Sequence, residues 1–222
     1  MIKNFKPLRA GFIWSLFSLC LLAVMGIGLS FSDSAYASIP FFFSFLEFVL
    51  PFLILFVWAY GAHKRVEGWK QVGQKSAADN LSFSWKMNFF LILPLPLIMS
   101  LLGQTYFVYL SLVTFVVWGY STVYEAGGLK KLEEENKVSL GMSRMCSLAG
   151  IMVYVCSLVI GLVDPMTDSL FSGFLIFSLL PSYFRVFVSS MVFASPLLIV
   201  SCINAIIQLK QVSVSNTAKG NT

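Results

Sequence analysis

Fourteen of the fifteen Lys and Arg residues in this 222-residue chain occur in four clusters, and long apolar runs separate the clusters. The clusters are Lys3, Lys6 and Arg9; Lys64, Arg65, Lys70, Lys75 and Lys86; Lys130, Lys131, Lys137 and Arg144; and Lys210 and Lys219. Because cytoplasmic loops of membrane proteins retain Lys and Arg, this pattern predicts the number of membrane crossings and their orientation. Arg185 is the one basic residue outside the clusters.

The composition agrees with a membrane protein. Hydrophobic residues make up 58% of the chain and charged residues 11%, whereas a soluble domain carries about 25% charged residues. With so few charged residues the chain cannot form a fully water-soluble surface, so lipid is expected to cover much of its outside. The net charge of +5 indicates loop topology and attraction to anionic membrane lipid. Nucleic acid is not an expected partner, because no basic stretch is long enough or interleaved with aromatic residues.

The apolar runs predict an all-α fold with six transmembrane helices, since each run approaches the length that crosses about 30 Å of hydrocarbon. Residues 1–222 would form a single integral membrane domain of three helical hairpins. Both termini would be cytoplasmic, as would loops 63–86 and 125–145. The predicted spans are 10–31, 39–62, 87–103, 105–124, 146–163 and 186–209.

Two parts of this topology have alternatives. A cleaved signal peptide ending at Ala35-Tyr36-Ala37 competes with the first span, but the apolar run is longer than the usual 7–15-residue core of a signal peptide. Residues 170–209 could cross once or twice. One crossing keeps Lys210 and Lys219 with the other basic clusters, so segment 170–181 is predicted to be interfacial or re-entrant. A long tilted or broken helix is the alternative.

Turn residues refine the predicted cytoplasmic loops. Gly73 to Asn80 is small and polar, which is typical of a loop. Ala126-Gly127-Gly128 is predicted to end the fourth helix. The charged segment from Leu129 to Val138 is then either a short solvated helix or an extension of a membrane helix.

Glu47 is the strongest candidate functional residue, because an ionisable group within a span is costly and needs a named partner. Pro51, four residues on, frees the Glu47 carbonyl and favours a kink. Glu47 and Arg185 are both predicted in the half of the membrane opposite to the cytoplasm. The two could form an ion pair that closes the outer side of the bundle or lines a cavity. The alternatives are a Glu47 near the headgroups or bonded to a neighbouring helix, and an Arg185 that snorkels to the interface.

Pro94 and Pro96 interrupt the third span, and Asn204 places an amide in the sixth. Broken helices in transporters expose carbonyls that bind ions or substrates, but a proline in a membrane helix is more often a tolerated kink, and this is the favoured interpretation here. Asn204, with Ser201 and Cys202, is expected to hydrogen-bond between helices.

The sequence offers little for catalysis. The one histidine is His63, and the four cysteines form no CxxC pair, so no cofactor or metal site is expected. The leading hypothesis is a non-enzymatic, multi-pass protein of the cell inner membrane that contacts membrane lipid and another membrane protein. It would be a subunit of a transfer or secretion assembly, or an immunity- or exclusion-type protein. A small-solute or ion transporter using Glu47 and Arg185 is the alternative, and a lipid-acting enzyme is third.

Overall fold

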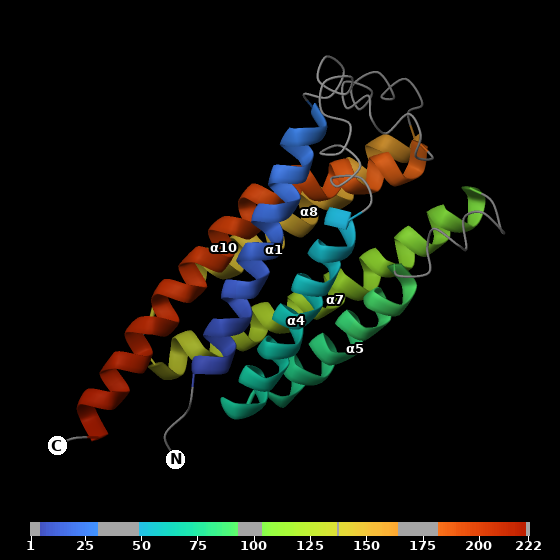
Figure 1. Cartoon of the computed structure of the whole chain (residues 1–222). Helices are drawn as coiled ribbons and strands as arrows, with labels where there is room; N and C mark the ends of the chain where they lie inside the picture. Colours follow the sequence, from blue (N-terminus) through green and yellow to red (C-terminus); the bar gives the residue numbers. More distant parts are fainter. Residues whose placement is uncertain (1–4, 31–48, 93–103, 137, 164–181, 221–222) are drawn as a thin grey trace.

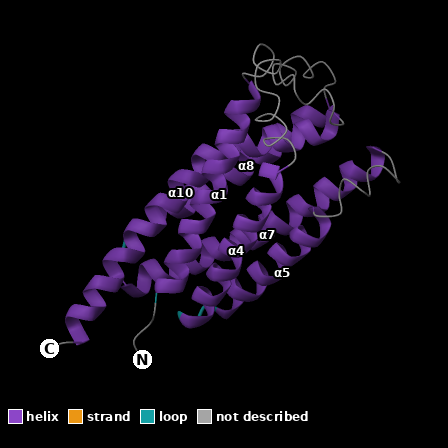
Figure 2. Ribbon diagram, viewed as in Figure 1, coloured by secondary structure: helices purple, strands orange, loops and turns teal. Residues whose placement is uncertain are grey.

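The fold is α-helical, and no strand occurs in the residues that the structure describes. The computed structural model describes residues 5–30, 49–92, 104–136, 138–163 and 182–220. They form α1 Lys6–Ser30, α4 Leu50–Gln71, α5 Lys75–Ile92, α7 Gln104–Asn136, α8 Gly141–Val163 and α10 Ser182–Gly220 (Figure 1). Figure 2, coloured by secondary structure, shows helices and short loop segments in the described part of the chain. The all-α prediction is therefore confirmed.

Residues 63–86, expected to form a loop, are helical apart from a turn at residues 72–74. The amides of Gly73 and Gln74 bond back to carbonyls of α4, and Gly73 has φ +80°, a conformation that glycine adopts without steric cost. α5 then begins at Lys75 because its apolar side chains recur at helical spacing. Those that are buried in its first turns are Ala77, Ala78 and Leu81. The loop predicted over Gly73–Asn80 is therefore wrong beyond Gln74.

The break predicted at residues 126–128 is also wrong, because α7 continues through it to Asn136. Gly128 lies against the Trp69 ring, where a Cβ atom would come 3.0 Å from Cζ3. The glycine therefore serves close packing instead of ending the helix. The charged segment after Gly128 was predicted to be either a separate short helix or an extension of the preceding helix. It is an extension of α7. Segment 125–145 accordingly contains the end of α7 and the start of α8.

The six helices are arranged as a ring in chain order. Each helix packs against the next described one, and α10 returns to pack against α1. The start of α1, the α4–α5 turn and the end of α10 lie at the same end of the bundle (Figure 1). α10 is continuous from Ser182 to Gly220 and contains Pro196. Segment 170–181 and the possible cleavage site at Ala35–Ala37 lie outside the described residues.

Glycine brings α1 and α4 into backbone contact. A Cβ on Gly61 would lie 2.9 Å from the amide nitrogen of Ser15, and a Cβ on Gly68 would collide with the backbone of Leu8. Ser18 Oγ donates to the carbonyl of Ile54 at 3.2 Å further along the same interface. The two antiparallel helices therefore have no room for larger side chains along this contact.

The main core lies at one end of the bundle, and we call it the end cluster. It contains the start of α1, the α4–α5 turn region, the α7–α8 junction and the last described side chains of α10. Its members are Phe5, Leu8, Phe12, Val66, Trp69, Val72, Ala77, Ala78, Leu81, Leu129, Leu132, Leu140, Cys202, Ala205, Leu209 and Val212. A smaller core of Tyr154, Ala194 and Leu198 joins α8 to α10.

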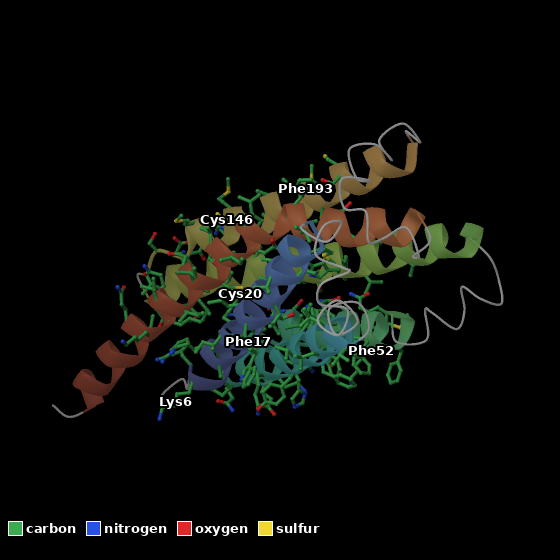
Figure 3. The ribbon with its side chains drawn as sticks, turned by 45° about the horizontal axis from the view of Figure 1, so that its top comes forward. Lys6, Phe17, Cys20, Phe52, Cys146 and Phe193 are labelled. Carbon is green, nitrogen blue, oxygen red and sulfur yellow. The ribbon has the colours of Figure 1, made fainter. Side chains whose placement is uncertain are left out.

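Polar side chains are buried and large apolar side chains are exposed over much of the described bundle. The buried polar residues are Ser15, Ser18, Ser84, Asn88, Ser121, Thr122, Glu125, Ser143, Ser190, Ser195 and Ser201. Exposed apolar side chains occur on all six helices. Three of them, Phe17, Phe52 and Phe193, come from three different helices (Figure 3). The described bundle therefore has an apolar core, buries several polar side chains and also exposes large apolar side chains on each helix.

Two helices are long and apolar enough to cross a membrane, within the residues whose side chains are described. They are Lys6–Val24 in α1 and Ser190–Val212 in α10, with mean hydropathies of 1.7 and 2.1. A core helix of a soluble protein or a signal sequence passes the same test of length and composition. The helical bundle thus has two candidate membrane-spanning helices, and the six crossings remain a prediction.

Candidate functional site

Most residues singled out from the sequence fall outside the described structure. Glu47, Pro94 and Pro96 lie in the ranges 31–48 and 93–103, which are not described. Arg185 lies in the first turn of α10, but its side chain is not described. The Glu47–Arg185 pair therefore stays a prediction.

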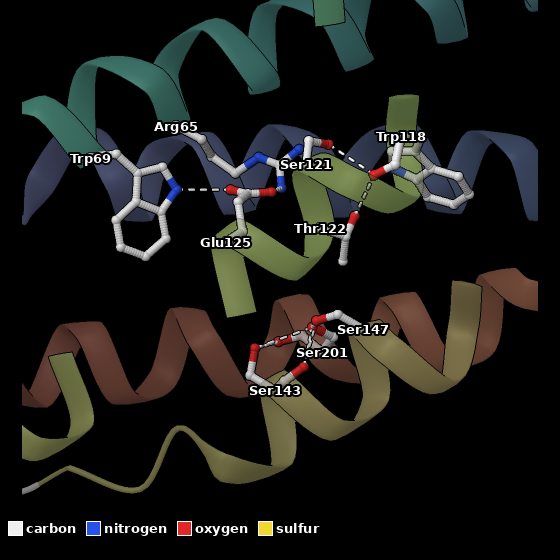
Figure 4. Close-up of polar contacts among 9 residues, drawn as sticks. All are labelled: Arg65, Trp69, Trp118, Ser121, Thr122, Glu125, Ser143, Ser147 and Ser201. Carbon is white, nitrogen blue, oxygen red and sulfur yellow. Dashed lines mark hydrogen bonds and ion pairs between the residues drawn. The ribbon is translucent and has the colours of Figure 1, made fainter. Parts of the chain in front are cut away.

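Asn204 is described and is half-buried on α10, where its Nδ2 atom is buried without a hydrogen-bond partner among the described residues. Its neighbour Ser201, from the same predicted polar patch, does bond between helices. Ser201 Oγ donates to the carbonyl of Ser143 on α8 at 2.8 Å, and Ser143 Oγ donates to the carbonyl of Ser201 at 2.8 Å. Ser147 Oγ also lies 2.9 Å from Ser201 Oγ. The three hydroxyls join α8 to α10 (Figure 4).

A buried ion pair is the most distinctive polar feature of the described interior. Arg65 Nη1 on α4 donates to Glu125 Oε2 on α7 at 2.8 Å. Trp69 Nε1, one turn after Arg65, donates to the other carboxylate oxygen at 2.8 Å. The side chains of Arg65 and Glu125 are only 13% and 8% exposed. Both carboxylate oxygens therefore have a donor (Figure 4).

The surroundings of Arg65 extend the contact to α1. Its guanidinium lies over the Phe12 ring, 5.6 Å from the ring centroid. Gly11 leaves room for the arginine, because a Cβ there would stand 2.6 Å from the Arg65 amide nitrogen. Arg65 Nε is buried without a partner among the described residues. The ion pair thus links α1, α4 and α7 through one arginine.

This pair is suited to holding helices together. Each oxygen of the Glu125 carboxylate accepts a hydrogen bond from a side chain of α4, one from a guanidinium and one from an indole N–H. Separating the partners would leave a charge buried without compensation, which is costly in a poorly hydrated interior. Chemically, the arrangement is a clamp between α4 and α7, which are not consecutive in the ring.

Sequence patterns did not predict this site, because Arg65 belongs to a basic cluster at a helix end and Glu125 to a predicted loop. A usable signal was present. Arg65 and Trp69 are four residues apart and so share a helix face. Glu125 follows directly after the predicted span 105–124, so extending both helices by one turn would have placed a carboxylate and a guanidinium inside the bundle.

A second charged group lies outside the bundle on α4. Glu67 accepts from Lys64 Nζ at 2.8 Å and lies 3.2 Å from His63 Nε2. The hydrogen bond from Lys64 lowers the pKa of Glu67, and the same bond raises the pKa of Lys64. Both side chains are at least 30% exposed, so solvent screens the interaction.

No group of three or more His, Cys, Asp or Glu side chains that could hold a metal ion occurs in the described part of the chain. Comparisons with protein-family models, with curated proteins and with solved structures found no match.

Proposed function

We propose that this chain is a six-span protein of the cell inner membrane with both termini cytoplasmic, and that it acts through contacts with another membrane protein. The observation that carries the proposal is the distribution of polarity. Serines, an asparagine and an ion pair are buried, while phenylalanine, valine and methionine side chains on every helix are exposed. Exposed apolar surface of this extent is typical of contact with a membrane or with another protein.

The end cluster supports the proposed orientation. It gathers residues from the N-terminal segment, from segments 63–86 and 125–145, and from the C-terminal part of α10. The first three lie in or next to segments that the basic clusters assign to the cytoplasm, and the α10 members are the end of the predicted span 186–209 and Val212 beyond it. Their meeting at one end agrees with three hairpins whose termini are both cytoplasmic.

A role in contact is favoured over catalysis by how the interior polar groups are used. The hydroxyls of Ser143, Ser147 and Ser201 bond to one another, and Glu125 is held by two donors. These groups stabilise helix packing. The exposed apolar side chains on the outer faces are the surface on which another membrane protein would dock.

Photo-crosslinking in native membranes tests this proposal. A photoreactive residue is placed at exposed sites on four helices: Phe17, Phe90, Met152 and Phe193. We expect a protein adduct of one defined mass from at least one site and lipid adducts from the others. Leu209, which is 1% exposed, serves as the buried control and should give no intermolecular adduct. Lipid adducts alone at all four sites would overturn the proposal.

A transporter is the second candidate, and a specific observation favours it. Ser15 Oγ, Arg65 Nε, Asn88 Oδ1 and Asn204 Nδ2 are buried and have no partner among the described residues. Buried polar groups are normally bonded, so these atoms could line a hydrated path together with Glu47 and Arg185. A transporter should lose flux on Glu47→Gln while inserting normally. A contact protein should keep its crosslinked adduct in that variant.

A further inference from the structure

Aromatic rings form a continuous strip across α4 and α5, in which Phe56 and His63 are exposed and Trp85 and Phe89 are half-buried. Phe56 on α4 lies edge-on to Phe89 on α5, with ring centroids 5.6 Å apart. Trp85 follows, 6.5 Å from Phe89, and His63 on α4 lies 6.1 Å from Trp85. Phe90 borders the strip and is 70% exposed. Because the rings contact one another, their side chains are already ordered before a ligand binds. Binding of a flexible apolar chain to this surface therefore costs little side-chain entropy.

One unpaired cation lies beside this strip. Lys86 is exposed and follows Trp85 directly on α5. Among the described residues it has no carboxylate partner, whereas Lys64 pairs with Glu67 and Arg65 pairs with Glu125. The Lys86 ammonium is therefore available to an anion from outside the protein. Asp79, the exposed acid on the same helix, lies about 10 Å further from the apolar strip, at 1.5 Å per residue.

We propose that the α4–α5 strip is a binding site for an anionic phospholipid, with the phosphate at Lys86 and an acyl chain along Phe89, Phe90 and Phe56. The inference rests on the proposed membrane topology. In that topology His63 follows the second span and Lys86 precedes the third, so both lie at headgroup level. Phe90 is one turn deeper, about 6 Å towards the hydrocarbon, as an acyl chain requires.

Charge selects the headgroup. The Lys64–Glu67 pair is neutral overall, which leaves the Lys86 ammonium as the uncompensated charge beside the rings. A lysine near a membrane surface attracts anionic lipid by an amount that corresponds to about fivefold in binding. A zwitterionic lipid carries its own cation and gains less. Phosphatidylglycerol should therefore be preferred over phosphatidylcholine at this strip.

Quenching of tryptophan fluorescence by lipids with brominated acyl chains measures this preference. The full chain is reconstituted in vesicles that contain brominated phosphatidylglycerol or brominated phosphatidylcholine. The difference in quenched fluorescence between the wild-type chain and the Trp85→Phe variant gives the signal from Trp85. We expect brominated phosphatidylglycerol to bind next to Trp85 about fivefold more strongly than brominated phosphatidylcholine. Equal quenching of the Trp85 signal by the two lipids overturns the proposal.

Matched lysine variants separate a site from general surface charge. Lys86→Gln should bring the preference close to one, and Lys86→Arg should keep it. Lys75→Gln removes the same charge from an exposed position on the same helix and should leave the preference unchanged. If Lys75→Gln lowers it as much as Lys86→Gln does, there is no site at the strip. A chain that alkaline carbonate extracts from the membrane would instead refute the membrane topology.

Discussion

The α1–α4–α7 side and the α8–α10 side of the bundle are held together by different chemistry. On the first side, Arg65 and Glu125 form an ion pair, beside glycines that admit no larger residue. On the second side, serine hydroxyls bond across the interface, and the atoms nearest to a Cβ on Gly150 would belong to the side chains of Leu198 and Leu197 rather than to backbone. The first contact is charged and geometrically strict, whereas the second is neutral and adaptable.

The difference lies in what happens when one partner is lost. A buried charge without its counter-ion cannot relax into water, and breaking such a pair by removing one partner costs about 3–5 kcal/mol. A serine that loses its partner can rotate its hydroxyl towards its own helix. Hydrogen bonds between membrane helices average about 0.6 kcal/mol. The two sides should therefore respond to substitution with very different magnitudes.

Glu125→Ala should give the largest effect. It leaves the Arg65 guanidinium and the Trp69 indole N–H buried without their acceptor, so the free energy of unfolding should fall by about 3–5 kcal/mol. Denaturant titration of the detergent-solubilised protein measures it. The double variant Arg65→Met with Glu125→Leu removes both charges and should recover most of the loss. If the double variant is as unstable as the single one, the charge is not the cause.

Gly68→Ala should come next, because its methyl group would meet the backbone of Leu8, which cannot move aside as a flexible side chain can. Overpacking of this kind costs about 1–3 kcal/mol. The same titration measures it. Gly127→Ala is the matched control, since a Cβ there meets no atom within 4 Å. Because alanine favours helix by about 1 kcal/mol over glycine, the control should be stabilised.

Ser143→Ala on the α8–α10 side should cost less, about 0.5–1.5 kcal/mol, since it removes neutral hydrogen bonds. Ser143 Oγ donates to the Ser201 carbonyl at 2.8 Å and lies 3.1 Å from Ser201 Oγ. Ser195→Ala is the control, because Ser195 Oγ bonds to the Val192 carbonyl within its own helix. A loss in Ser143→Ala as large as that in Glu125→Ala would remove the contrast between the two sides.

The helices were predictable from the sequence, because long apolar runs dictate them. Their ends were not, because polar composition at Gly73–Asn80 and the glycines at 127 and 128 resemble loop signals. At Gly128 the deciding fact is a contact with Trp69, which lies 59 positions away in the chain. Tertiary packing of this kind overrides local propensity.

The candidate site was less predictable than the fold for a similar reason. A positively charged residue at a helix end predicts on which side of the membrane that end lies. It does not tell whether the side chain faces water or the bundle interior. Arg65 and Lys64 are neighbours in the sequence, yet Arg65 pairs with buried Glu125 and Lys64 with exposed Glu67. Successive side chains of an α-helix point about 100° apart, so one neighbour can face the interior and the next the outside. A count of charges in a segment does not distinguish these two directions.

The exposed Glu67 pair gives the smallest expected effect and shows how little charge contributes outside the bundle. Hydrogen bonding from Lys64 lowers the pKa of Glu67 below its ordinary value near 4.5. A lowered pKa in the folded state means that the contribution is present above the ordinary value and is lost as the pH falls through the folded value. Glu67→Gln should therefore reduce the loss of stability on acidification below about pH 4.5. Denaturation midpoints measured across pH 3–6 check this, and added salt should shrink the difference because the pair is exposed. A large effect that persists in high salt would mean that this pair, like Arg65–Glu125, is shielded from water.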